Sequence, residues 1–180
     1  TTRDTLSLHD ALPIWTNLDW YDEIIDDDAL AETDLRDVRF LINHNTDMIP
    51  LARSRNNNAN STMQMQVVPG VGMSIRVDLD TENNAEAKSL YSAVSRGDIS
   101  GMSFMFTVDS DIWEDLESEH PTRHIRSISK VFEVSAVTFP AYEATSITAR
   151  GLSDALESAK ASLESAKAER REIERKKQKL

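Results

Sequence analysis

The sequence predicts an α+β protein whose body is a mostly antiparallel sheet or barrel with one or two helices, followed by a long C-terminal helix. Two observations carry this prediction. Apolar and polar residues alternate over several short segments before residue 150, which is the spacing of half-buried strands. From Leu152 onward the apolar residues follow steps of four and three, which is the spacing of a helix.

The expected strands are separated by loops rich in turn-forming residues. Residues 38–44 alternate, so Val38, Phe40, Ile42 and His44 would share one face of a strand. The further expected strands are residues 63–67, 73–79, 99–108 and 125–139, the last as one long strand or two shorter ones. In the segment 99–108, Ser103 lies on the face opposite the large apolar residues.

Two helices are expected. Residues 83–95 form the first, with Asn83 or Asn84 as N-cap and Gly97 after its end. Residues 152–180 form the second, because a heptad stripe runs through them for about four repeats. The stripe predicts a coiled-coil-like element for assembly or anchoring, and it becomes polar towards the C-terminal end.

The first fifteen residues (TTRDTLSLHDALPIW) are similar to translated sequencing-adapter readthrough, so we expect them to be non-native. Their charged residues leave no apolar stretch for a signal peptide. Residues 16–150 would then form the main domain, truncated at its N-terminal end, and residues 151–180 the helical tail.

Composition excludes several classes of function. The net charge is −11, and before Leu152 twelve Lys/Arg face twenty-five Asp/Glu, so the acidic body argues against a nucleic-acid partner. No apolar run approaches the ~20 residues of a membrane span. There is no cysteine, hence no thiol nucleophile, and no glycine-rich phosphate loop that would predict a nucleotide cofactor.

Three segments place reactive side chains on or beside expected strands. His44 could act as a general base at the end of its strand, although a partly exposed turn histidine is the commoner case. Ser103, with Ser100 as a near rival, could be a nucleophile, although position alone favours a serine on a solvent-facing strand. Glu133 lies in an apolar run, where a buried carboxylate needs a partner.

The partner of Glu133 stays open on these grounds. An imidazole N–H, as in a catalytic triad, and an ion pair with Arg126 or Arg76 are about equally consistent with the sequence. A rival constellation is Glu119, His120 and His124, because two histidines four residues apart on a helix can bind zinc. Pro121 breaks that helical spacing, so we expect no metal site.

Taken in order, three segments closely resemble the prohead protease family of tailed phages. They are VRFLINH at residues 38–44, RGDISGMSF at 96–104 and EVSAVTFPAY at 133–142. The third is the most specific, and the resemblance covers roughly residues 20–150. Met105, Ala136 and Asn45 stand where that family commonly has Gly, Pro and Asp, and none of these departures removes a reactive group.

The resemblance implies a serine protease related in fold to the herpesvirus assembly proteases, a β-barrel wrapped by helices. It implies that His44 is the base, that Ser103 is the nucleophile and that Glu133 orients the histidine, although the herpesvirus relatives use a second histidine there. We expect no metal or other cofactor to take part.

The resemblance also implies a role in virion maturation. The protease would cleave the scaffolding region of the major capsid protein and itself, inside the assembling procapsid in the host cytoplasm, and would self-associate. The alternative is a non-enzymatic capsid scaffolding or assembly protein built on the same barrel.

Overall fold

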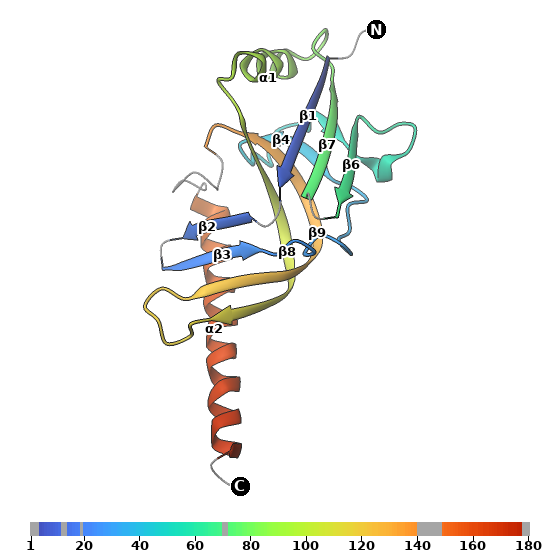
Figure 1. The fold of residues 1–180 in the computed structure, drawn as a ribbon. Helices are drawn as coiled ribbons and strands as arrows, with labels where there is room; N and C mark the ends of the chain where they lie inside the picture. The colour runs from blue at the N-terminus through green and yellow to red at the C-terminus, as the bar shows by residue number, and fades with distance from the viewer. Residues whose placement is uncertain (1–3, 12–13, 19, 70–71, 140–148, 178–180) are drawn as a thin grey trace.

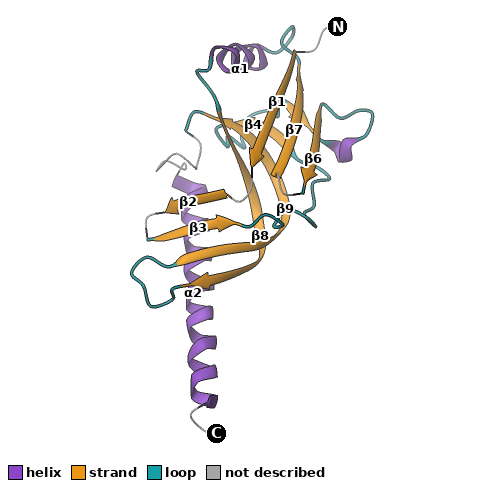
Figure 2. Ribbon diagram, viewed as in Figure 1, coloured by secondary structure: helices purple, strands orange, loops and turns teal. Residues whose placement is uncertain are grey.

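The computed structural model describes residues 4–11, 14–18, 20–69, 72–139 and 149–177, which form two β-sheets, a short helix and a long helix (Figures 1 and 2). One sheet is antiparallel, in the order β1 (Asp4–Ala11), β7 (Gly72–Leu79) and β6 (Met63–Val68). The α+β class is confirmed. The two sheets do not close into a barrel within the described ranges, so the herpesvirus-like barrel stays a prediction.

The second sheet is built around β9 (Thr122–Val137). Its order is β2 (Ile14–Leu18), β3 (Tyr21–Ile25), β9, β4 (Arg39–Ile42) and β5 (Ala52–Arg53). β3 and β4 pair in parallel with opposite ends of one edge of β9, and β8 (Gly101–Glu114) pairs antiparallel along the other edge. β9 is therefore one long strand, the first of the two alternatives that the sequence left open.

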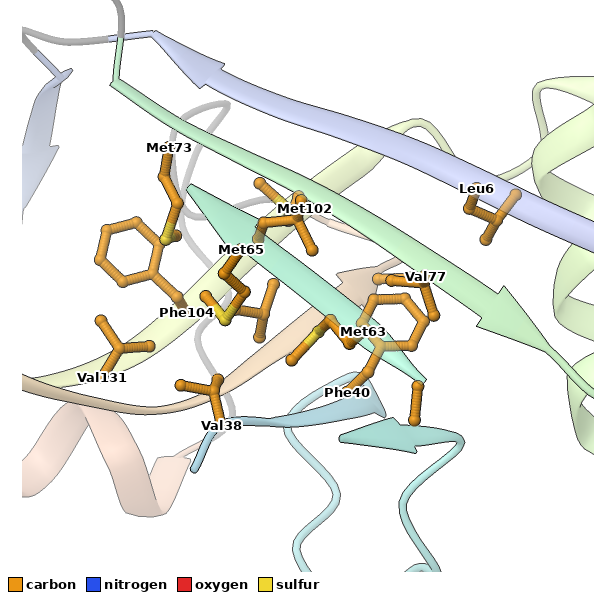
Figure 3. Packing of buried hydrophobic residues seen from close by; sticks show 14 of the residues in the cluster. Leu6, Val38, Phe40, Met63, Met65, Met73, Val77, Met102, Phe104 and Val131 are labelled. Carbon is orange, nitrogen blue, oxygen red and sulfur yellow. The ribbon is translucent and has the colours of Figure 1, made fainter. Parts of the chain in front are cut away.

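The main hydrophobic core lies between the two sheets. Alternate residues of β6 and β7 face alternate residues of β4, β8 and β9, and methionines fill much of the space (Figure 3). Phe40, Met63, Val77 and Val131 are completely buried there. Because the core occupies one face of the β4–β9–β8 segment, the polar residues that alternate with it lie on the opposite face.

Helix α1 (Ala85–Arg96) has the caps that the sequence predicts, although it begins two residues later and ends one residue later than the expected 83–95. The side chain of Asn84 accepts hydrogen bonds from the backbone of Glu86 and Ala87, and Gly97 ends the helix with φ +79°. Residues 27–32, between β3 and β4, form a series of turns.

Helix α2 (Ala149–Lys177) crosses the second sheet and extends well beyond it (Figure 1). Ala159 and Leu163 of its stripe are buried against Tyr21 and Trp113. The hydroxyl of Ser162 accepts a hydrogen bond from Trp113 Nε1 and donates to Asp111. The described part of the stripe up to residue 166 thus packs on the chain's own sheet, and residues 168–177 are exposed.

The segment expected to be non-native takes part in these sheets. β1 pairs with β7 over its whole length, and Leu6 lies in the main core. β2, which also begins before residue 16, pairs with β3. The origin of residues 1–15 stays a prediction.

Candidate active site

Glu133 lies near the C-terminal end of β9, on the face opposite the core. Val134 and Ala136 point into the core, so Glu133 and Ser135, which alternate with them, point away from it. A bulge precedes this stretch, because Met105 pairs with Glu133 whereas Phe106 pairs with Val131. The bulge keeps Val131 and Val134 in the core while Glu133 stays outside it, and Glu133 is still only 3% exposed.

His44 reaches Glu133 through a sharp turn at the end of β4. Asn43 and His44 both have left-handed backbone, with φ of 51° and 55°. The side chain of Asn43 accepts a hydrogen bond from the backbone N–H of Thr138, and the backbone N–H of Asn43 donates to the carbonyl of Ala136. The chain therefore folds back over β9 instead of continuing along it.

This turn corrects the expected face of His44. A continued strand would place His44 beside Phe40 and Ile42, but the left-handed pair reverses the alternation and brings the ring over the other face of the sheet. Nδ1 of His44 lies 2.6 Å from Oε1 of Glu133. The backbone N–H of His44 donates to Ser135 Oγ at 3.0 Å, and that hydroxyl donates to the other carboxylate oxygen of Glu133 at 2.6 Å.

Ser103 enters the same face from β8. It pairs with Ser135 across the two strands, and paired residues project to the same side of a sheet. Met102 and Phe104, on either side of it, are buried in the core. Ser103 is 7% exposed, and among the residues that the structure describes no hydrogen bond joins its hydroxyl to His44.

The arrangement settles the partner of Glu133 that the sequence left open. Arg126 pairs with Asp26 and Arg76 with Asp78, so neither arginine neutralises Glu133. Another arginine, Arg39, stands opposite Glu133 in the β4–β9 register, but its guanidinium contacts Asp37.

Asp37 is ionised and can therefore pair with Arg39. It also accepts hydrogen bonds from Arg53, which keep the pKa of Asp37 below its usual value. The described partners of the Glu133 carboxylate are therefore the ring of His44 and the hydroxyl of Ser135, the residue that pairs with Ser103 across β9 and β8.

The rival histidines lie elsewhere and do not gather. His120 contacts Asp22, and Nδ1 of His124 contacts Asp26 at 3.1 Å. No group of three or more His, Cys, Asp or Glu side chains with metal-binding geometry occurs in the described part of the chain.

Sequence reasoning missed two contributors to the site, Ser135 and Asn43. Ser135 is two residues after Glu133, and this spacing places both on one face of a strand. Asn43 precedes His44 and belongs to a residue type that favours turns and tolerates left-handed backbone, so the sequence indicates a turn there but not its hydrogen bonds with Thr138 and Ala136. The cross-strand pairing of Ser103 with Ser135 has no local signal in the sequence.

Comparison with known proteins identifies the family. The sequence model described as caudovirus prohead serine protease matches residues 13–159. The chain belongs to the caudovirus prohead serine protease family. This confirms the resemblance drawn from the three motifs.

Membership in the prohead serine protease family indicates a phage serine protease that works on a capsid protein, in the assembling procapsid inside the host cell. No curated protein and no solved structure matches the chain. No helix in the described ranges is both long enough and apolar enough to cross a membrane.

Proposed function

We propose that this prohead protease cleaves peptide bonds with Ser103 as nucleophile, His44 as general base and Glu133 as the group that orients the histidine. The observation that carries the proposal is the contact of Nδ1 of His44 with Glu133 at 2.6 Å, on the face of the sheet that Ser103 also occupies. A carboxylate on Nδ1 selects the tautomer that carries its proton there. Nε2 is then left unprotonated, as a general base requires.

The chemistry follows from this tautomer. His44 Nε2 takes the proton of Ser103 Oγ as that oxygen attacks the substrate carbonyl, and backbone N–H groups stabilise the resulting oxyanion. The imidazolium, stabilised by Glu133, returns the proton to the leaving amine, which departs and leaves an acyl-enzyme. Water activated by His44 then hydrolyses the ester and frees Ser103.

The substrates we propose are the scaffolding region of the major capsid protein and the protease itself. We further propose that the two sheets belong to a herpesvirus-protease-like barrel and that the enzyme self-associates. Residues 169–177 of α2 support an anchoring role, because all of them are exposed and they lie beyond the segment that packs on the sheet. We propose no coiled coil for the described apolar part of the stripe, because it packs on the chain's own sheet.

Co-expression with the phage's capsid protein tests the assignment. Ser103→Ala and His44→Ala should each abolish processing of the capsid protein, as seen by the mass of the product. Ser100→Ala is the matched control, since Ser100 is an exposed neighbour outside β8, and it should process normally. Continued processing by either of the first two variants would overturn the assignment.

Removing residues 169–180 tests the proposed anchor. Because the described side chains in this range are exposed, the truncated protein should fold and cleave normally but fail to enter procapsids. Normal incorporation would contradict the anchoring role while leaving the catalytic assignment intact.

A non-enzymatic assembly protein is the second candidate, favoured by the low exposure of Ser103 and by the absence of a described hydrogen bond between it and His44. Apo serine hydrolases often tighten this contact only when substrate binds, which favours the protease. Labelling of Ser103 by a fluorophosphonate separates the two, because an unactivated serine does not react.

A further inference from the structure

Ser135 occupies the centre of the candidate site, although the proposed mechanism does not use it. It lies on β9 between β4 and β8, two residues after Glu133 and directly opposite Ser103. Its exposed fraction is 0%, so its hydroxyl must be satisfied by protein groups. Both groups that satisfy it belong to the site.

The two hydrogen bonds of Ser135 fit the chemistry of a hydroxyl. Its single proton goes to Oε2 of Glu133 at 2.6 Å, and its oxygen accepts the backbone N–H of His44 at 3.0 Å. Glu133 then has one oxygen on Ser135 and the other on the ring of His44 at 2.6 Å. The carboxylate cannot rotate about its last torsion without breaking one of these bonds.

The backbone of His44 also needs this support. Its left-handed conformation, at φ 55°, is unfavourable for a residue with a side chain. Asn43 holds one end of the turn through Thr138 and Ala136. Ser135 holds the other end, because it accepts the N–H of His44 itself.

We propose that Ser135 is a positioning residue, whose hydroxyl fixes both the carboxylate of Glu133 and the backbone of His44 so that the imidazole keeps Nδ1 on Glu133 and leaves Nε2 free. That a correctly held imidazole activates Ser103 rests on the proposed function. The hold on the imidazole rests on the hydrogen bonds alone. The hydroxyl of Ser135 thus joins the base His44 to β9 and fixes the carboxylate of Glu133, on the strand that pairs with the one carrying Ser103.

The rate at which a fluorophosphonate labels Ser103 of the full chain, followed by intact-mass spectrometry, tests the proposal. Ser135→Ala should label roughly 10- to 100-fold more slowly, the size expected for losing a hydrogen bond to a charged group. Ser135→Thr keeps the hydroxyl and should recover most of the rate. Ser135→Cys keeps the size and weakens both bonds, so it should be slowed as well and carries the test if the alanine variant does not fold.

Ser127→Ala is the matched control. Ser127 also lies on β9 and its hydroxyl also donates to a carboxylate, that of Asp109 at 3.0 Å, but it is remote from Ser103. This variant should label at the wild-type rate. Equal slowing of Ser127→Ala and Ser135→Ala would mean a general loosening of β9 and would overturn the positioning role.

A second readout does not depend on catalysis. The Nδ1 proton of His44, in a 2.6 Å contact with Glu133, should give a far-downfield proton NMR signal that disappears in His44→Gln. The signal should move upfield or broaden in Ser135→Ala or Ser135→Cys and stay unchanged in Ser127→Ala.

The outcomes separate this inference from the proposed function. Labelling within twofold of wild type together with an unchanged signal, in a folded Ser135→Ala or Ser135→Cys variant, overturns the inference alone. Failure of wild-type Ser103 to label overturns the proposed function, and the NMR signal still decides whether Ser135 holds the ring.

Discussion

Replacing Glu133 by glutamine should separate activity from stability more sharply than any other single change. The side chain keeps its size, so the packing of β9 is preserved, and a neutral amide is easier to bury than a carboxylate at a position only 3% exposed. We therefore expect the free energy of unfolding to change by less than about 2 kcal/mol.

Activity should fall far more, because an amide cannot both keep the proton on Nδ1 of His44 and accept the proton of Ser135. If its oxygen faces Nδ1 of His44, its NH2 group faces the hydroxyl of Ser135, whose own proton then has no acceptor. If the amide is flipped, its NH2 group faces Nδ1, and the ring proton must move to Nε2, where the base has to be free. The second arrangement abolishes the base, and we expect acylation to slow by roughly 10³- to 10⁴-fold.

Fluorophosphonate labelling of Ser103 and urea unfolding, measured on the same sample, give the two quantities. Asp26→Asn is the matched control, since it breaks another contact between a carboxylate and a histidine Nδ1, that with His124 at 3.1 Å. The control should label at the wild-type rate. A Glu133→Gln protein that is folded and labels within tenfold of wild type would refute the role of Glu133.

Three further predictions concern stability. Burial alone would raise the pKa of Asp26, but hydrogen bonds from a neighbouring arginine and histidine outweigh it and lower the pKa. The ionised form of Asp26 therefore stabilises the fold above about pH 4, and this contribution is lost as the pH falls through the lowered pKa. In urea unfolding, wild type should lose more stability than Asp26→Asn between roughly pH 5 and pH 2, and equal losses would contradict this. Leu163→Ala should lower the free energy of unfolding in urea by about 2–4 kcal/mol, because it leaves a cavity between α2 and the sheet. Ile173→Ala, at an exposed position, should lower it by less than about 0.5 kcal/mol. Similar effects of the two changes would mean that α2 does not pack on the sheet. Gly97→Ala should cost about 1–2 kcal/mol in the same assay, from its φ of +79° alone, because nothing lies within 4 Å of the added methyl group; a neutral result would rule out the left-handed cap.

Most elements of the fold could be predicted because their signals are local. The alternation in β6 and β7, and the cap residues Asn84 and Gly97 of α1, each act within a few residues of chain. What could not be predicted is how these elements pair. β9 receives two strands in parallel on one edge, and this arrangement depends on contacts between segments about a hundred residues apart.

The candidate site divides in the same way. His44, Ser103 and Glu133 could be named from the family motifs, because each motif carries one reactive residue. The face that His44 occupies could not, since the left-handed turn depends on partners that β9 supplies. The role of Ser135 could not be predicted for a similar reason, because it depends on the hydrogen bond that its hydroxyl accepts from the backbone of His44, on another strand's end.

The register of β8 against β9 is what places Ser103 at the site, and the core protects that register. Because side chains alternate along a strand, a slip of one residue would turn Ser103 into the core and expose Met102 and Phe104. Losing the burial of two such side chains costs roughly 3–6 kcal/mol, a large share of the stability of a typical domain. The site therefore needs no contact between Ser103 and His44 to keep the serine on the face that the histidine shares with Glu133, since the apolar residues on either side of Ser103 already hold it there.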